Sequence, residues 1–356
     1  MSLITSPVML DSTGKDIAAS LHRQNELLRA IAGESVTRLT TSMKEIQRIV
    51  RVGLAQEIFN IGDQIVVPWT NVATGTKYDV PMDVVHFGEV ERQDGETVPG
   101  MYLQWHYLVP VEICFDAAEA ELATESVFDG NLFYYTKSGS NYALETVTAG
   151  QSIPSDTEYY HNAVKVDTGE ILRYGYNRWA HSSIRQWLNS DAGVGQWWTA
   201  QHVGDTAPAE LGQTAGFLSG FDEDFLSVLT PVKVTTATNP VSEPDKTIGS
   251  EVTYDKFFLP SLEQMFVDPG SIKGEGEYWE YWKQAIGQSQ RAKNNNVAYE
   301  GYITRDLEEP HSEKSTFLRT ARTNSSRFMW YITPAGAMNG INANAKRNCA
   351  PACVIC

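Results

Sequence analysis

Long hydrophobic runs are missing from this sequence, and none approaches the ~20 residues that a membrane-spanning helix requires. The first residues, Met1–Ser6, also lack the basic segment followed by an apolar one that marks a secretory signal. We therefore expect synthesis in the cytoplasm and no membrane insertion. Basic residues are scarce, with 28 Lys and Arg against 44 Asp and Glu and a formal charge of −16. Because a phosphate backbone attracts a basic surface, we expect no nucleic-acid partner.

Cysteine is also rare, with four residues in the whole chain, and three of them fall in the last eight positions. Cys349, Cys353 and Cys356 match no strong zinc-site spacing, and no His lies near them in the sequence. Packing of these thiols as small apolar groups is the favoured interpretation, and part of a zinc site is the alternative. We predict neither a metal nor a cofactor.

Motifs typical of catalysis are missing as well. The histidines form no HxxxH or HExxH pair, and no glycine-rich phosphate loop occurs. Glu275, Glu277 and Glu280 lie among Tyr and Trp residues, a combination that suits glycoside chemistry when two carboxylates flank one bond. Spacing alone does not show that they converge, so an exposed acidic turn is the favoured interpretation. We predict that the protein is not an enzyme, and an enzyme with converging carboxylates stays as an alternative.

The sequence does contain enough apolar material for a large core, with 356 residues, 42% of them hydrophobic, and nine tryptophans. Hydrophobic patterns predict strands at 65–69, 84–87, 101–109, 132–135 and 231–237. Short helices are predicted after the capping residues Ser42, Ser182 and Ser261, and at 221–229, where acidic residues near the start favour the helix dipole. The mixture of short helices and many strands predicts an α+β fold.

The end of the chain differs in charge from the rest. No Asp or Glu occurs after Glu313. The six basic residues that follow give the tail a formal charge of +6, against −22 for residues 1–313: Lys314, Arg319, Arg322, Arg327, Lys346 and Arg347. This segment is therefore chemically distinct.

The same tail has the pattern of a β-hairpin. Residues 328–333 alternate in the manner of a strand, and Pro334 and Gly336 supply a turn before a returning strand at 337–341. Small and amide residues are frequent around this hairpin, as they are in antibody binding loops, with Tyr331 and Phe328 available as anchors. The plainer interpretation is a terminal hairpin and polar loop that close a domain.

Three segments of the tail, 317–321, 329–332 and 342–355, resemble the variable region of diversity-generating retroelement target proteins, a class that includes the phage major tropism determinant. The resemblance implies a C-type lectin fold and mutation of template adenines, so that Asn codons are the most variable positions. Adenine mutation of an Asn codon cannot produce Lys, Glu, Gln, Trp or Met. Between residues 322 and 341, the only residues of those five types are Met329, Trp330 and Met338.

We therefore predict that Met329, Trp330 and Met338 are scaffold, together with Ile332 and Gly336. The resemblance implies that the outward, ligand-binding positions are Arg322, Asn324, Ser325, Arg327, Phe328, Tyr331, Thr333, Pro334, Ala337, Asn339, Gly340 and Ile341.

A second resemblance covers roughly residues 50–356. It rests on short marks spread along the chain, at 62–63, 183–189, 222–229, 255–261, 317–320 and 350–352. Together they are similar to a family of uncharacterised domains from gut bacteria and their phages. This resemblance implies a C-type lectin-like domain of the formylglycine-generating-enzyme type at 49–356, with a variable region at about 317–349.

The N-terminal segment, 1–48, is interpreted as an arm with helices that serve oligomerisation or virion attachment. Apolar residues of a predicted helix at 17–32 form a seam of two heptads, so a trimer is one possible assembly. Docking of this helix on its own domain is the alternative, because two heptads are marginal alone.

These observations favour a phage receptor-binding protein, carried in the virion, that binds a host cell-surface protein or glycan and contacts other virion proteins. The alternative is a structural virion protein, such as a head decoration or tail component, with a fixed assembly surface at its C-terminal end.

Overall fold

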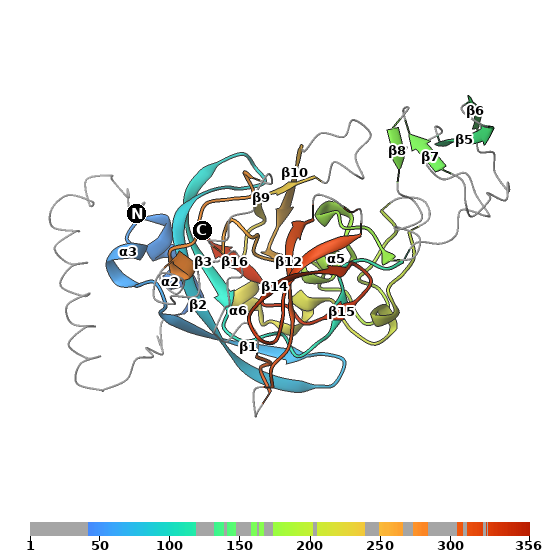
Figure 1. The fold of residues 1–356 in the computed structure, drawn as a ribbon. Helices are drawn as coiled ribbons and strands as arrows, with labels where there is room; N and C mark the ends of the chain where they lie inside the picture. Colours follow the sequence, from blue (N-terminus) through green and yellow to red (C-terminus); the bar gives the residue numbers. More distant parts are fainter. Residues whose placement is uncertain are drawn as a thin grey trace.

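We describe a computed structural model of the protein (Figure 1). The structure describes residues 42–118, 132–138, 141–146, 158–161, 164–166, 174–201, 205–238, 249–265, 273–283, 305–308, 312–322, 325 and 327–356. The predicted helix at 17–32 lies outside these residues.

A five-stranded antiparallel sheet forms the centre of the molecule, in the strand order β1-β2-β3-β16-β11. Its strands are β1 (Gln64–Asn71), β2 (Thr76–Glu91), β3 (Thr97–Trp105), β16 (Ala352–Ile355) and β11 (Phe257–Phe258). All four residues of β16 are buried between β3 and β11, which explains why this end of the sequence is a short apolar run. The strand predicted at 101–109 lies four residues earlier than expected, because β3 begins at Thr97 and ends at Trp105.

Four smaller antiparallel sheets complete the strand structure. They comprise β12 (Thr316–Ala321), β13 (Phe328–Ile332) and β14 (Met338–Asn342); β9 (Val232–Ala237) and β10 (Ser250–Asp255); β4 (Ile113–Cys114) and β15 (Lys346–Arg347); and β5 (Leu132–Ser138), β6 (Asn141–Thr146), β7 (Glu158–His161) and β8 (Val164–Val166).

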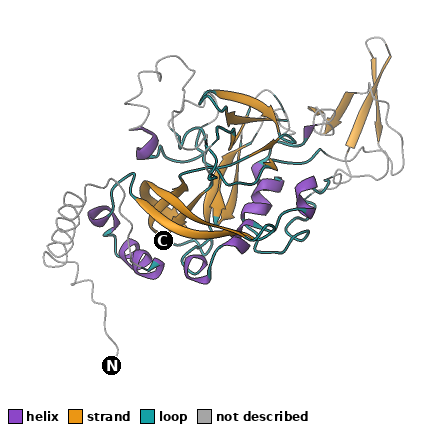
Figure 2. Cartoon of the chain, turned by 90° about the horizontal axis from the view of Figure 1, so that it is seen from below, coloured by secondary structure: helices purple, strands orange, loops and turns teal. Residues whose placement is uncertain are grey.

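Short helices lie beside the strands (Figure 2). The α-helices are α2 (Met43–Arg51), α3 (Ala55–Ile58), α5 (Ser183–Leu188) and α6 (Glu223–Leu226), and the 3₁₀ helices are η2 (Trp179–His181), η3 (Ala209–Gly212) and η4 (Phe217–Gly220). The predicted caps Ser42 and Ser182 are confirmed, because each accepts a hydrogen bond from the backbone N–H three residues later, and Asp222 caps the helix predicted at 221–229 in the same way. Ser261 Oγ accepts from Gln264 N, but residues 262–265 form a turn and not the predicted helix. The α+β class is therefore confirmed.

Helix α2 is part of the core. Ile46 and Val50 are buried in it, and Gln47 Nε2 donates a 2.8 Å hydrogen bond to the carbonyl oxygen of Cys356. The packed domain therefore includes residues from Met43 onward and begins before the boundary at residue 49 that we expected. The C-terminal strand lies beside this helix (Figure 1).

An aromatic cluster fills the core beside the central sheet. Phe217 of η4 lies 5.7 Å from Trp69, 5.4 Å from Trp105 and 5.0 Å from Phe257, measured between ring centroids. Such pairs add about 0.5–1.5 kcal/mol each beyond the area they bury. All four cysteines are buried free thiols, which agrees with the packing interpretation. No helix in the described part of the chain is both long enough and apolar enough to span a membrane.

Candidate ligand-binding surface

The predicted terminal hairpin is present. β13 and β14 pair in register from Phe328 opposite Asn342 to Ile332 opposite Met338. Thr333 N donates a 2.8 Å hydrogen bond to the carbonyl of Ala337, and Gly336 has φ 78°, which glycine adopts without strain. On its other edge β13 pairs with β12, so the hairpin is held in a three-stranded sheet.

Several buried residues anchor this sheet to the core. Met329 and Ile332 have no exposed surface, and Gly336 is buried as well. Met338 is half-buried and packs against the core cluster. The inward position of these four residues agrees with their predicted scaffold role. Trp330 is also half-buried, but its ring lies beneath an arginine side chain.

That arginine is Arg322, at the end of β12. Its Cζ lies 4.9 Å from the ring centroid of Trp330 and 5.8 Å from that of Phe328. The side chain crosses Gly340, which is paired with Trp330, and a Cβ added at Gly340 would lie only 2.6 Å from Arg322 Cδ. The absence of a side chain at residue 340 therefore lets Arg322 rest on the sheet.

Two further arginines stack on aromatic rings nearby. Arg327 Cζ lies 4.2 Å from the Tyr174 ring and 4.5 Å from the Phe328 ring, and Arg347 Cζ lies 5.8 Å from the Tyr331 ring. Each such contact contributes about 0.5–1 kcal/mol at an exposed site. We call this set the arginine–aromatic surface: Tyr174, Arg322, Arg327, Phe328, Trp330, Tyr331 and Arg347.

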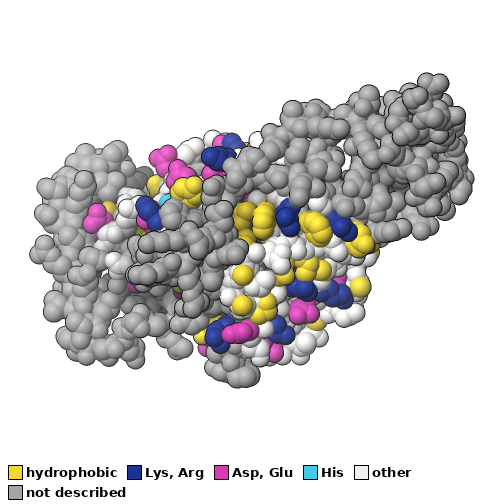
Figure 3. Space-filling view, viewed as in Figure 1, with side chains coloured by type: hydrophobic (Ala, Val, Ile, Leu, Met, Phe, Trp, Pro, Cys, Tyr) yellow, Lys and Arg dark blue, Asp and Glu magenta, His cyan; other side chains and the backbone are white. Residues whose placement is uncertain are grey.

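Hydrophobic and basic side chains lie next to one another over the region of β12, β14 and β15 (Figure 3). Lys346 at its margin is neutralised by Glu210, whose Oε1 lies 2.6 Å from Nζ, and this hydrogen bond raises the pKa of Lys346. Arg319, by contrast, is fully buried and belongs to a different site.

The predicted ligand-binding residues are distributed unevenly. Pro334 and Asn339 are exposed, and eight others are half-buried: Arg322, Arg327, Phe328, Tyr331, Thr333, Ala337, Gly340 and Ile341. Asn324 lies outside the described residues. The prediction that Ser325 faces outward is wrong, because this residue is 5% exposed. Its carbonyl accepts a 2.7 Å hydrogen bond from Asn177 Nδ2, and its Oγ accepts one from Arg327 N.

The segment at 174–177 supports the hairpin, a role that we did not predict from the sequence. Asn177 Nδ2 also donates to the carbonyl of Phe328, and Asn344 N donates to the carbonyl of Tyr174. Gly175 has φ 77°, and a Cβ there would lie within 3 Å of the Ala117 carbonyl oxygen, so the residue must be glycine. The Tyr-Gly-Tyr-Asn sequence was the available signal, since a glycine between aromatics often marks a close backbone approach.

The three glutamates considered for glycoside chemistry have separate environments. Glu277 and Glu280 are exposed or half-exposed, as an acidic turn requires. Glu275 is buried, which the turn interpretation did not predict. Its Oε1 accepts from Ala237 N at 3.1 Å and its Oε2 accepts from Thr320 Oγ1 at 2.5 Å. Burial raises the pKa of Glu275, and the Arg319 charge opposes that shift. Both of its oxygens are therefore occupied by structural hydrogen bonds.

Within the described ranges, no group of His, Cys, Asp and Glu side chains is arranged to hold a metal ion.

The geometry defines an α+β protein with a stacked arginine–aromatic surface on its C-terminal hairpin. The family model described as "Domain of unknown function (DUF6273)" matches residues 159–356, more than half of the chain, and the chain therefore belongs to this family. The matched segment contains the whole hairpin and the 174–177 segment that supports it. No curated protein and no solved structure matches the chain significantly.

Proposed function

We propose that the arginine–aromatic surface binds a ligand on a host cell, and that the protein is a phage receptor-binding protein whose residues 322–341 are diversified by a retroelement. The proposal includes a C-type lectin-like scaffold. This part of it rests on the sequence resemblance and agrees with the α+β class.

One observation carries the proposal. The hairpin combines two fully buried residues, Met329 and Ile332, with three arginine–aromatic stacks made by partly exposed side chains. Arginine and large aromatic residues are the types that contribute most binding energy at protein interfaces. Because the buried residues fix the backbone, changes at the partly exposed positions alter contacts without altering the fold.

The stacks also order the surface before a ligand arrives. Arg322 is held between Trp330 and Gly340, and Arg327 between Tyr174 and Phe328. A side chain that is already ordered loses less conformational entropy on binding, and immobilising a flexible one costs about 0.5–1.5 kcal/mol. Several ordered arginines therefore favour tight and selective contact.

Sequencing the 3′ end of the gene across one natural population tests the proposal. Substitutions should arise from template adenines and concentrate at codons 322–341, while codons 329, 330 and 338 stay constant. Codon 325 should accept only small residues, because Ser325 is enclosed. A segment as uniform as the rest of the gene would refute diversification. Failure of particle assembly after replacement of 322–341 would instead favour a structural role in the virion.

A further inference from the structure

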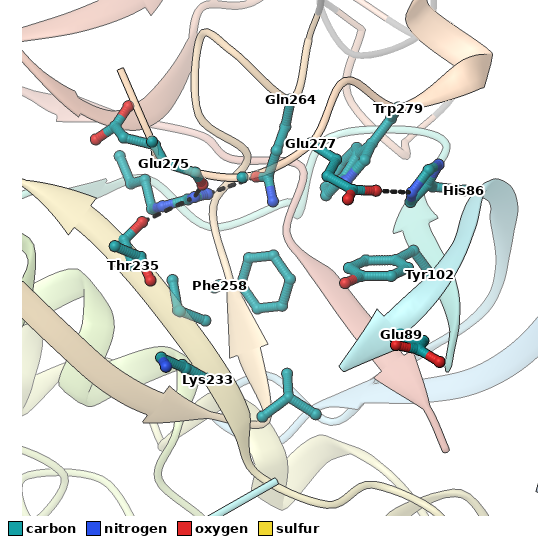
Figure 4. A pocket seen from close by; sticks show the side chains of 15 residues that line it. His86, Glu89, Tyr102, Lys233, Thr235, Phe258, Gln264, Glu275, Glu277 and Trp279 are labelled. Atoms are coloured by element: carbon teal, nitrogen blue, oxygen red, sulfur yellow. Dashed lines mark hydrogen bonds and ion pairs between the residues drawn. The ribbon is translucent and has the colours of Figure 1, made fainter. Parts of the chain in front are cut away.

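A pocket elsewhere in the molecule shares no lining residue with the arginine–aromatic surface (Figure 4). Strands β2, β3, β9, β11 and β12 and the segment 274–279 enclose a cavity of about 200 Å³. Pockets for drug-sized ligands measure about 300–1,000 Å³. The cavity therefore suits a smaller molecule of about one ring.

A β-bulge in β2 places His86 at one side of this pocket. The pairing of β2 with β3 shifts between Val84 and His86, so that His86 lies opposite Tyr102 with their ring centroids 5.3 Å apart. Bulges commonly redirect a side chain near a functional site. His86 is 9% exposed, and its Nδ1 is buried without a hydrogen-bond partner among the described residues. Burial lowers the pKa of His86, so the ring is neutral at pH 7 and one nitrogen can accept while the other donates.

Aromatic rings form the apolar part of the wall. Trp279 lies 5.8 Å from Tyr102 and 6.4 Å from Phe258 between ring centroids. Trp279 and Phe258 are almost fully buried, whereas Tyr102 keeps some exposed surface. Tyr102 therefore offers a partly exposed side chain with a hydroxyl group, which Figure 4 shows directed toward Phe258.

Hydrogen-bond donors come from the buried end of the pocket. Arg319 Nη1 donates to Gln264 Oε1 at 2.5 Å and to the Leu259 carbonyl, and its Nη2 donates to the carbonyls of Glu275 and Thr235. Arg319 Nε is buried and has no partner in the described part of the chain. Because Gln264 Oε1 is occupied by Arg319 and by Ser261 N, the amide nitrogen of Gln264 is the end that faces the cavity (Figure 4).

Acceptors lie on the opposite, open side. Glu277 has an exposed carboxylate whose Oε2 lies 3.5 Å from His86 Nε2, and Glu89 lines the same opening. Lys233 also lines the pocket, but its Nζ is held by Glu91 at 2.8 Å. The opening therefore carries carboxylates, while the buried end carries N–H donors.

This combination selects the charge of a ligand. An anion would be repelled by Glu277 and Glu89. A cation would be repelled by the buried guanidinium of Arg319 and would offer no acceptor to the amide nitrogen of Gln264. A hydroxyl group both donates and accepts, so a neutral ring with several hydroxyls can satisfy both ends. We propose that this pocket binds a single neutral sugar ring, with its apolar face on Tyr102 and its hydroxyls bonded to Gln264 and Glu277.

The sugar site is separate from the proposed diversified surface, since none of its lining residues falls within 322–341. Diversification of the hairpin would leave it unchanged. Its ligand would therefore be the same in every variant, while the ligand of the arginine–aromatic surface varies.

Saturation-transfer NMR and calorimetry on the full chain test the proposal, with methyl glycosides of glucose, galactose and mannose as neutral probes. Choline serves as the cationic probe and glucuronate as the anionic one. We expect at least one neutral glycoside to bind with millimolar or tighter affinity, and choline and glucuronate not to bind. Glu277→Gln should weaken binding roughly tenfold, because a hydrogen bond to a charged acceptor is replaced by a neutral one.

Glu280→Gln is the matched control, because this carboxylate is in the same segment but does not line the pocket. Tyr102→Phe keeps the ring and removes the hydroxyl, which separates stacking from hydrogen bonding. Thermal unfolding of each variant shows whether the fold is intact. No binding of any neutral glycoside at tens of millimolar, binding of choline or glucuronate alone, or equal affinity of the folded Glu277→Gln variant would each overturn the proposal.

Discussion

Replacing Met329 by Ala tests the division of the hairpin into buried positions and binding positions. Met329 has no exposed surface and lies opposite both Ile341 and Ala321 in the three-stranded sheet. Truncation of a buried Met to Ala removes its transfer free energy and leaves a cavity, at a cost of about 2–5 kcal/mol. We expect the upper half of this range to apply only if neighbouring side chains cannot move into the space.

Urea unfolding followed by tryptophan fluorescence measures this loss. With an m-value of about 2–3 kcal/mol/M, a loss of about 3 kcal/mol lowers the unfolding midpoint by about 1–1.5 M. Asn339→Ala is the control, because Asn339 is exposed on the partner strand and surface changes usually stay within about 0.5 kcal/mol. Equal destabilisation by the two substitutions, or a change below about 1 kcal/mol for Met329→Ala, would refute the proposed division.

Three further changes test other parts of the structure. Gly340→Ala should displace Arg322 from Trp330, which should weaken ligand binding and shift the NMR signals of the Trp330 indole. The lost stacking should lower the free energy of unfolding by about 0.5–1 kcal/mol. Unchanged indole signals would contradict this prediction. Arg319→Met should lower the free energy of unfolding by about 3–5 kcal/mol, because it leaves the buried Glu275 without its cation. The double variant Arg319→Met/Glu275→Gln should recover part of that loss. A double variant no more stable than Arg319→Met alone would argue against the pairing of the two residues. Burial lowers the pKa of His86 in the folded state below the value of about 6.5 expected in the unfolded chain. The unfolded state therefore binds the proton first, so stability should be complete above about pH 6.5 and decrease as pH falls, and His86→Gln should reduce that slope.

Local features of the fold were predictable because their signals lie within a few residues. Ser42, Ser182 and Asp222 cap helices through bonds that span three positions, and side-chain chemistry at one residue determines each of them. The 328–342 hairpin was predictable for the same reason, since alternation and a Pro-x-Gly turn specify it. These signals do not depend on the rest of the molecule.

Features made by distant segments could not be predicted in this way. The burial of Ser325 depends on Asn177, and the packing of α2 depends on the carbonyl of Cys356, and neither pair is close in sequence. The pocket is lined by residues from five strands, so no local sequence pattern predicts it. Glu275 was misassigned to an exposed turn because its partner Thr320 lies on β12, far along the sequence.

The position of β16 has a consequence for synthesis of the chain. This strand follows the hairpin in the sequence yet pairs with β3, about 250 residues earlier. At about 5–20 residues per second, a ribosome makes β3 well before β16, so the central sheet stays incomplete until residues 352–355 have emerged. A chain that stops within the hairpin leaves the edges of β3 and β11 unpaired, which exposes them to aggregation and proteolysis. The central sheet therefore closes only after translation has passed residue 355, later than synthesis of the hairpin itself.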